Sequence, residues 1–317
     1  MERGERESAV TEDAELDLNL LLALGALLED RNLTRAGERI GMSQPAMSAA
    51  LARLRRHFGD ELLARDGNGY ELTALGAALR DRSAAACELL ERVFASQAVF
   101  DASAEEREFT LMGSDYAVAV FGARLARAVA ESAPGVRLTF RQNPADLTED
   151  VGALLATIDG LLLPHGVISG FPALELYRDR WVVLVAEDNP EVGEELTLDA
   201  LARLPWAAYQ RMHDTPATRQ LTMLGVEPLV QVSCDSFHLL PALVAGTRRV
   251  ALIPYLLASR IVPGTGGVRI METPYEAVPL RGALWWHPVH TQDAGHAWLR
   301  ETAALVGARI TPSADSS

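Results

Sequence analysis

Two helical segments separated only by Gly41 and Met42 constrain the fold of this chain most. Asn32 is suited to cap the first segment, and Gly41 is suited to end it. Ser43 can cap the second, which runs from Gln44 to about His57. Two short helices joined by so tight a turn predict a helix-turn-helix.

The second helix has two faces of different composition. At 100° per residue one side is apolar and should pack inward; it consists of Met47, Ala50, Leu51 and Leu54. The opposite side consists of Pro45, Ser48, Ala49, Ala52, Arg53 and Arg56. Small residues there would let the backbone approach DNA, and arginines suit phosphates and guanine edges. A solvated face with scattered arginines is the alternative for an isolated helix.

The residues that follow predict a hairpin and then a long helix. Segments 62–65 and 70–72 are joined by a turn at 66–69, which is typical of the wing beside a recognition helix. Thr73 can cap a helix from about Ala74 to Gln97. Its approximate heptad seam consists of Leu75, Leu79, Ala86, Leu90 and Val93. Such a seam favours pairing with a second copy, although packing on its own domain remains the alternative.

Charge is distributed unevenly along the chain. The formal net charge is −14, which argues against binding a polyanion. Residues 31–65, however, carry seven Arg against three acids, a local balance of +4. The acidity therefore lies outside a basic region near the N-terminus, and this region coincides with the predicted helix-turn-helix.

Residues 16–97 resemble the N-terminal winged helix-turn-helix and linker helix of LysR-type transcriptional regulators. The motif Ser43-Gln44-Pro45-Ala46-Met47-Ser48, followed by Leu54 and Phe58-Gly59-Asp60, carries the resemblance. Ala49 stands where many members have Arg. The sequence of this segment is similar to that of the nodulation-regulator and aromatic-degradation branch. The expected DNA-binding residues are Arg35, Ser43, Gln44, Pro45, Ala46, Ser48, Ala49, Arg53, Arg55, Arg56, Arg65 and Asn68.

From Arg107 onward, short apolar runs alternate with helical stretches, which predicts α/β layers with largely parallel sheets. The expected strands are 109–113, 136–141, 158–163, 181–186, 226–233, 250–253 and 281–286, and the expected helices are 116–132, 217–224, 237–245 and 294–306. This half resembles the two-lobed, periplasmic-binding-protein-like effector domain of the same family. The resemblance implies two crossovers between the lobes, near 176–179 and 280–283.

Ligands of such lobes bind at the carboxyl ends of strands and at helix N-termini. The candidate effector-binding residues at those positions are Ser114, Asp115, Asn143, Pro164, His165, His213, Thr215, Asp235, Ser236 and Phe237. Ser114, Thr215 and Ser236 have helix capping as an alternative role. The imidazole of His213 and the ring of Phe237 suit an aromatic or carboxylated effector.

Catalysis and metal binding find little support in the sequence. Ser169 lacks the spacing of a nucleophile elbow, and neither a dinucleotide-binding nor a phosphate-loop motif occurs. No cysteine or acidic cluster completes a metal site around His287, His290 and His296. We therefore expect no enzyme, no metal and no cofactor. The two cysteines lie too far apart in sequence to indicate a disulfide framework.

These observations predict an α/β chain with an N-terminal all-α winged helix-turn-helix and a two-lobed periplasmic-binding-protein-like effector domain. The expected divisions are a disordered arm (1–15), the winged helix-turn-helix (16–73), a linker and dimerisation helix with hinge (74–105), the effector domain (106–312) and a tail (313–317).

We expect a cytoplasmic, ligand-responsive DNA-binding transcription factor. Its predicted partners are double-stranded DNA, a small organic effector and further copies of itself in a homodimer or homotetramer, with no membrane. A free solute-binding protein is the alternative. It would need a secretory signal, which the charged start lacks, and it would leave 16–97 unexplained.

Overall fold

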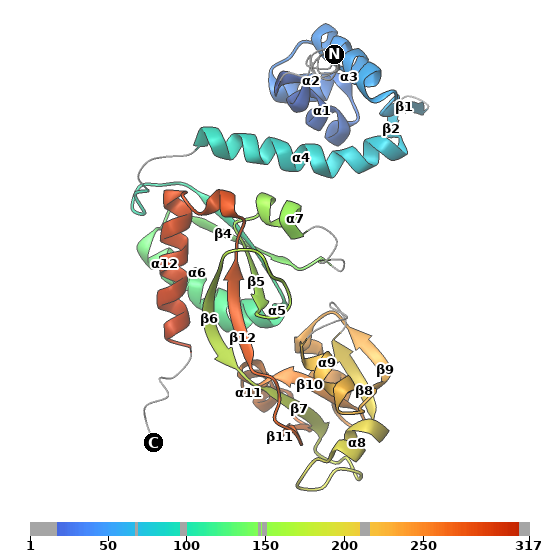
Figure 1. Ribbon diagram of the computed structural model, residues 1–317, viewed down its shortest axis with the longest axis vertical. Helices are drawn as coiled ribbons and strands as arrows, with labels where there is room; N and C mark the ends of the chain where they lie inside the picture. Colours follow the sequence, from blue (N-terminus) through green and yellow to red (C-terminus); the bar gives the residue numbers. More distant parts are fainter. Residues whose placement is uncertain are drawn as a thin grey trace, which may run out of the picture. The chain divides into compact units, whose positions relative to one another are not determined.

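The computed structural model describes residues 18–66, 69–95, 100–144, 147, 151–209 and 216–310. Contacts divide the chain into two compact units, residues 1–96 and residues 97–317. Each unit has its own secondary structure (Figure 1). The predicted arm at 1–15 and the predicted tail at 313–317 lie outside the described residues.

The first unit contains four helices and a hairpin within its described residues. They are α1 (Leu18–Asp30), α2 (Leu33–Ile40), α3 (Gln44–Phe58), β1 (Leu63–Asp66), β2 (Gly69–Leu72) and α4 (Ala74–Ala95). The Asn32 side chain accepts hydrogen bonds from the first turn of α2, which ends at Gly41 with a φ of 71°. The Ser43 side chain caps α3. The predicted helix-turn-helix and antiparallel hairpin are confirmed.

The core of the first unit lies among α1, α2 and α3. Met47 and Leu54 are almost fully buried there, together with Ala50 and Leu51. The inward face predicted for α3 is therefore confirmed. Burying these apolar side chains removes them from water, and this holds α3 in a fixed orientation on α1 and α2.

Helix α4 packs on its own unit along its first half. Leu75 and Leu79 contact the core of the first unit. Ser83 is buried one turn later, and the Cys87 thiol donates to the Leu21 carbonyl at 3.9 Å. Residues four apart share a helix face, so this face is occupied within the chain. Two of the five predicted seam residues, Leu75 and Leu79, thus have partners in their own unit.

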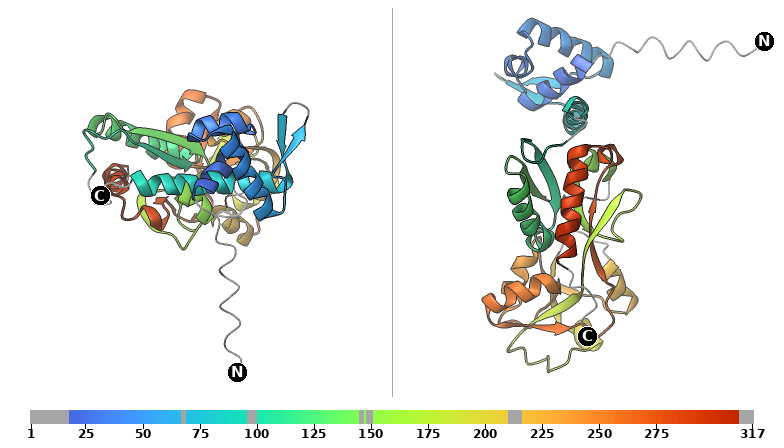
Figure 2. Two further views of the ribbon diagram at one scale, coloured as in Figure 1. Left: turned by 90° about the horizontal axis from the view of Figure 1, so that it is seen from above. Right: turned by 90° about the vertical axis from the view of Figure 1, so that its left-hand side faces the viewer.

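The second unit consists of two lobes, each with a five-stranded sheet. Lobe 1 contains β3 (Glu108–Gly113), α5 (Asp115–Ala117), η1 (Val118–Gly122), α6 (Ala123–Ser132), β4 (Arg137–Gln142), α7 (Val151–Thr157), β5 (Gly160–Pro164), β6 (Ala173–Asp179), β12 (Leu280–Trp285), η3 (Pro288–His290) and α12 (Ala294–Ala308). Helices α6 and α12 pack side by side in lobe 1 (Figures 1 and 2).

Lobe 2 is built from the segment between the two chain crossings. It contains β7 (Trp181–Ala186), α8 (Leu198–Arg203), β8 (Pro205–Tyr209), α9 (Pro216–Met223), β9 (Leu229–Cys234), η2 (Phe237–Leu239), α10 (Leu240–Val244), β10 (Val250–Pro254), α11 (Tyr255–Thr265) and β11 (Val268–Glu272). The chain enters lobe 2 at Arg180, next to the first predicted crossover. It returns through 273–279, just before the second predicted stretch, because 280–283 already belongs to β12.

Both sheets are mixed rather than largely parallel. The strand orders are β4-β3-β5-β12-β6 in lobe 1 and β11-β7-β10-β8-β9 in lobe 2. In each sheet three strands run parallel, and the other two pair antiparallel. The crossings account for this, because β6 and β12 carry the chain out of lobe 1 and back, and β7 and β11 are the first and last strands of lobe 2.

The apolar runs located most of the strands, but several elements were not predicted. Strand β7 occupies 181–186, as expected. The unpredicted elements are β6, β8, β11, α7, α8 and α11. Strand β8 begins at Pro205 and contains two alanines, so it lacks the β-branched residues that mark a strand. Within the described residues, no helix is both long enough and apolar enough to cross a membrane.

Candidate functional site

The solvent-facing side of α3 is made of small and polar residues. The exposed residues are Gln44, Pro45, Ser48, Ala49, Ala52 and Arg56, while Ala46 and Arg53 are half-buried. The Ser43 hydroxyl accepts from the Ala46 amide at 3.4 Å, so the first turn of α3 is held in place. This surface has short side chains near the helix N-terminus and an arginine farther along. Such a surface can approach a nucleic-acid groove closely.

Arg55 has a different setting from the other predicted DNA-binding arginines. Its guanidinium donates to the Glu61 and Leu63 carbonyls, both at 2.9 Å, and lies 2.9 Å from the Glu61 carboxylate. These bonds fasten α3 to the loop that leads into β1. Arg55 is thus placed to hold the hairpin rather than to extend into solvent.

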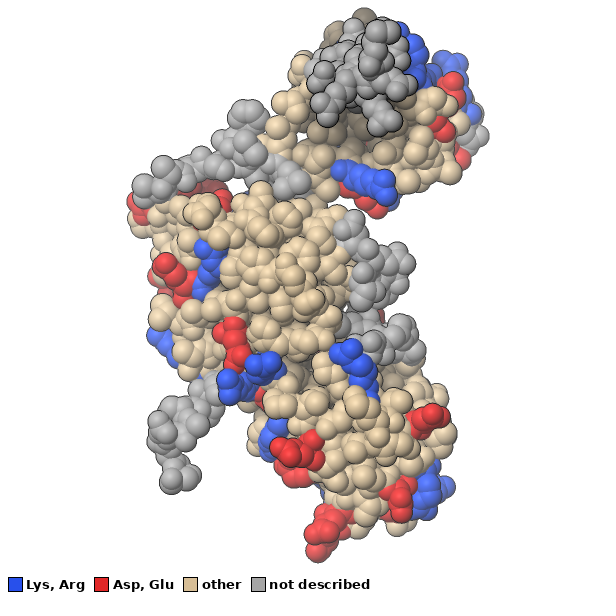
Figure 3. All heavy atoms as spheres, viewed as in Figure 1, with Lys and Arg blue, Asp and Glu red and all other residues tan. Residues whose placement is uncertain are grey.

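The remaining predicted positions in the first unit are spread over several elements. Arg35 is exposed on α2 and donates to the Asp30 carbonyl at 2.9 Å. Arg65 is exposed on β1, and Asn68 lies outside the described residues. Basic side chains lie at one edge of this unit in the space-filling view, with acidic side chains beside them (Figure 3). The exposed arginines are the side chains there that can contact a polyanion.

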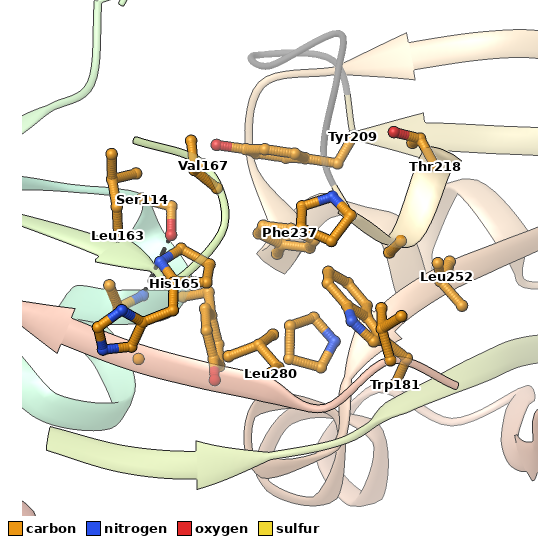
Figure 4. A pocket seen from close by; sticks show the side chains of 18 of the residues that line it. Ser114, Leu163, His165, Val167, Trp181, Tyr209, Thr218, Phe237, Leu252 and Leu280 are labelled. Carbon is orange, nitrogen blue, oxygen red and sulfur yellow. Dashed lines mark hydrogen bonds between the residues drawn. The ribbon is translucent and has the colours of Figure 1, made fainter. Parts of the chain in front are cut away.

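A cavity of about 220 Å³ lies between the two lobes of the second unit. Lobe 1 contributes the ends of β3 and β5 together with part of β12, and lobe 2 contributes residues from β8, β10 and α9. Ser114 and His165 face Tyr209 and Phe237 across it (Figure 4). The described lining residues include no Asp, Glu, Lys or Arg. The cavity thus offers an apolar environment with a few polar groups.

Five of the predicted effector-binding residues line this cavity: Ser114, Asn143, Pro164, His165 and Phe237. Three others, Asp115, Asp235 and Ser236, are not among the lining residues. His213 and Thr215 lie outside the described residues. Strand ends and helix starts therefore do meet at the cavity. Neighbouring residues at one such end can differ, since Ser114 lines the cavity and Asp115 does not.

The polar groups that line the cavity come mainly from lobe 1. The Ser114 hydroxyl oxygen accepts from the Ala117 amide at 3.3 Å, so it caps α5 and keeps its own hydrogen to donate. Asn143 is buried at the end of β4. The His165 ring packs edge-on against Trp285, with 5.1 Å between ring centroids. These three side chains can supply directional hydrogen bonds to a bound molecule.

An aromatic wall on lobe 2 was not predicted in full. The rings of Tyr209 and Phe237 are stacked, with centroids 3.9 Å apart and an angle of 12° between their planes. Trp181, Trp206 and Thr218 also line the cavity. Tyr209 ends β8, so assigning that strand would have pointed to it, since ligands gather at such ends. Flat walls of this kind suit a ring-containing ligand.

Asp179 joins the lobes at the first crossing. Its carboxylate accepts from the Tyr116 hydroxyl at 2.8 Å and from the Leu256 amide at 3.1 Å. Burial raises the pKa of Asp179, and several hydrogen bonds partly offset this. Burial, together with the nearby Tyr177 and Asp179, also raises the pKa of Tyr116 well above its usual value. This cluster holds the crossing segment beside the cavity.

The histidines considered for metal binding serve structural contacts. His290 and His296 are buried and stack at 5.3 Å between centroids. The Nε2 atoms of these rings lie 3.2 Å from the Leu155 carbonyl and 2.6 Å from the Asp159 carbonyl. Over the described residues, no group of three or more His, Cys, Asp or Glu is arranged to hold a metal ion.

Comparisons with known proteins cover both units. A family model for the bacterial regulatory helix-turn-helix proteins of the lysR family matches residues 18–77. A second model, for the LysR substrate binding domain, matches residues 102–306. Nodulation protein D 1 of Rhizobium meliloti (strain 1021) is 34% identical over 95% of this chain and 98% of its own length. Nodulation protein D 2 of Rhizobium tropici is 32% identical over 90% and 91%, respectively.

Solved structures show the same architecture. A probable transcriptional regulator from Pseudomonas aeruginosa has 27% identity and a TM-score of 0.65, covering 91% of this chain and 96% of its own. Full-length CbnR, solved with its target DNA, has 18% identity and a TM-score of 0.60, covering 90% of this chain and all of its own. The latter likeness concerns the fold alone.

Proposed function

The chain belongs to the LysR family of bacterial helix-turn-helix regulators, and we propose that α3 reads its operator while the interlobe cavity binds its effector. As a member, it is a DNA-binding transcription regulator that responds to a small molecule, forms oligomers and works in the cytoplasm. The observation that carries the proposal is that one chain has both an exposed face of small residues on α3 and an apolar cavity shared by two lobes.

In this proposal, Gln44, Pro45 and Ser48 approach base edges, because they are exposed at the N-terminal end of α3. Ser43, Ala46 and Ala49 lie close to the DNA backbone. Asn68, outside the described residues, is a further expected contact. The phosphate-binding arginines are Arg35, Arg53, Arg56 and Arg65. Arg55 positions the hairpin through its bonds to the loop after α3, so its effect on DNA binding is indirect.

A footprinting experiment on the DNA upstream of the protein's own gene tests the α3 assignment. Removing the Gln44 amide should relax base preference at one position by roughly tenfold, since a good base contact contributes about 1–3 kcal/mol. Gln142→Ala, at an exposed position on β4, is the matched control and should leave the footprint unchanged. An unchanged base preference in Gln44→Ala would place the reading surface elsewhere.

We propose that the effector is an uncharged organic molecule with at least one aromatic ring. The stacked wall of Tyr209 and Phe237 supports the ring, and Ser114, Asn143 and His165 support one polar group on the molecule. A carboxylate in the described part of the cavity would lose its hydration without meeting an Arg or Lys side chain there. These features favour a phenol over an aromatic acid.

Titration calorimetry with 2-naphthol and naphthoic acid tests the effector proposal. We expect 2-naphthol, which is uncharged at neutral pH, to bind at least tenfold more tightly than naphthoate. Phe237→Leu should weaken its binding by about tenfold, because the stacked ring is lost. Phe171→Leu, which alters an aromatic ring outside the lining set, is the control. Tighter binding of naphthoate would contradict the proposed ligand chemistry.

We also propose that the chain acts without catalysing a reaction. A regulator needs only a difference in affinity between two arrangements of its domains. This proposal is checked by recovering the bound effector after long incubation with the protein, and we expect it to be chemically unchanged. A modified molecule would show that the cavity has a catalytic role.

A further inference from the structure

Asp115 forms hydrogen bonds across the two lobes instead of lining the cavity. Its Oδ2 atom accepts from the Ser236 hydroxyl at 2.7 Å and from the His238 amide at 3.1 Å. The Nδ1 atom of the His238 ring lies 2.9 Å from the same oxygen. Its Oδ1 accepts from the Tyr116 amide at 2.9 Å, within lobe 1. One carboxylate of lobe 1 thus engages two residues of lobe 2.

The residues next to this bridge belong to the cavity walls. Asp115 directly follows Ser114, and Phe237 stands between Ser236 and His238. Both Ser114 and Phe237 line the cavity. The bridge therefore ties together two opposite walls through their immediate neighbours in sequence. Any separation of the lobes that widens the cavity at this point must stretch or break these bonds.

The electrostatic state of Asp115 suits this role. The side chain is only 14% exposed, and burial on its own would raise the carboxyl pKa. Hydrogen bonds from His238 and Ser236 outweigh the burial and lower the pKa below its ordinary value. Asp115 is therefore a carboxylate at neutral pH. Hydrogen bonds to a charged acceptor are stronger than those between neutral groups.

We propose that Asp115 is a positioning residue that holds the two cavity walls together through Ser236 and His238. Effector affinity then depends on hydrogen bonds that do not involve the effector itself. This inference rests on the proposed function, because it assumes that the effector binds in the cavity. If only the closed arrangement binds well, the apparent affinity falls with the fraction of closed molecules. Weakening the bridge lowers that fraction without removing any ligand contact.

The test combines two measurements on the full chain. Hydrogen exchange of the peptides spanning 114–118 and 236–240 reports the opening of the bridge without any ligand. Calorimetry with 2-naphthol reports affinity. In Ser236→Ala we expect exchange in both peptides to rise about tenfold and the 2-naphthol Kd to rise about tenfold, which corresponds to about 1.4 kcal/mol. Ser236→Thr keeps the hydroxyl and should restore both values.

Further variants separate the bridge from general damage to the fold. Asp115→Asn should reproduce Ser236→Ala, and the double variant should show less than the sum of the two effects. Asp188→Asn removes an exposed carboxylate in the turn after β7 and should change neither measurement. Ser259→Ala removes a hydroxyl that, among the described residues, bonds to the Leu256 carbonyl one turn away, and it should also have no effect.

Each result decides the inference. Increased exchange with an unchanged 2-naphthol Kd would overturn the link between bridge and affinity. Unchanged exchange in Ser236→Ala would overturn the bridge itself. If 2-naphthol fails to bind the wild-type protein, the proposed ligand chemistry falls. In that case the hydrogen-exchange measurement alone tests whether the bridge exists. Faster exchange in Ser236→Ala, restored to the wild-type rate in Ser236→Thr, would support the bridge.

Discussion

His296 shows how a single buried side chain can link stability to pH. The Nε2 atom lies 2.6 Å from the Asp159 carbonyl, which can only accept, so this nitrogen carries the hydrogen. The Nδ1 atom lies 2.7 Å from the Arg300 guanidinium, which can only donate. The ring is therefore neutral, with both nitrogens engaged. Burial is the main cause that lowers its pKa from 6.5 to about 4; the hydrogen bond to the Asp159 carbonyl opposes this, and the Arg300 guanidinium adds to it.

We predict that the folded chain loses stability as the pH falls from about 6.5 to about 4. In that window the unfolded chain takes up a proton at position 296 and the folded chain does not, so acid favours unfolding. The loss from this residue amounts to about 3 kcal/mol across the window. Denaturant unfolding at several pH values should show a shallower pH dependence in His296→Gln than in the wild type. A His287→Gln control should retain the wild-type slope, and equal slopes in all three proteins would contradict the prediction.

At the scale of elements, the start of α4 is fixed by close contact with the loop before β1. Asp60 accepts from the Thr73 hydroxyl and the Leu62 amide, both at 2.6 Å. These two hydrogen bonds lower the pKa of Asp60. Gly76 lies so close that a Cβ there would stand 2.3 Å from the Leu62 carbonyl oxygen. A side chain at this position would therefore push α4 away from the hairpin.

We predict that Gly76→Ala destabilises the first unit by about 1–3 kcal/mol, although alanine is the better helix former. The control is Ala77→Ser at the next, exposed position, which should cost about 0.5 kcal/mol. Thermal unfolding followed by circular dichroism measures both. A stabilised Gly76→Ala protein would mean that helix propensity outweighs the contact with Leu62.

The two halves of α4 should respond differently to a buried charge. Leu79 packs on the core of its own unit, so Leu79→Asp should lower the unfolding temperature of that unit. Leu90 is half-buried and lies in the second half of the predicted seam. We propose that this half pairs protomers, so Leu90→Asp should leave the fold intact and give smaller assemblies in light scattering. An unchanged mass for Leu90→Asp would mean that another surface holds the oligomer together.

For the whole molecule, the distribution of charge matters more than its sum. The net charge of −14 would repel DNA if it were spread evenly. The arginines of α3 lie instead on the first unit, and opposite charges are mixed on the visible face of the second (Figure 3). An acidic protein can therefore bind DNA through one local surface.

We predict salt-dependent binding to duplex DNA in which Arg56 contributes one phosphate contact. Arg56→Ala should weaken binding and reduce the slope of log affinity against log salt by about one. Arg137→Ala removes an arginine that is 81% exposed on lobe 1 and is the matched control. Fluorescence anisotropy at several salt concentrations measures both slopes. Identical slopes in the wild type and Arg56→Ala would remove Arg56 from the interface.

The sequence by itself determined the features that follow local rules. Asn32, Gly41 and Ser43 mark helix ends because a cap needs only the residues within one turn. The buried face of α3 and the strand at 181–186 follow from the period of apolar residues. Ser114 and Phe237 were predictable as cavity residues because each follows a strand of its own lobe, and ligands bind at such strand ends.

Only the tertiary structure decided the roles that depend on distant partners. Asp115 and Ser236 occupy the same kind of position as Ser114, yet their side chains bond to each other across 121 residues of sequence. Leu79 has the spacing of a pairing seam but packs on the core of its own unit, and Tyr209 stacks on a ring that comes from another element. Local pattern specifies which face of an element is apolar or polar. Which surface that face meets depends on how the chain brings remote segments together.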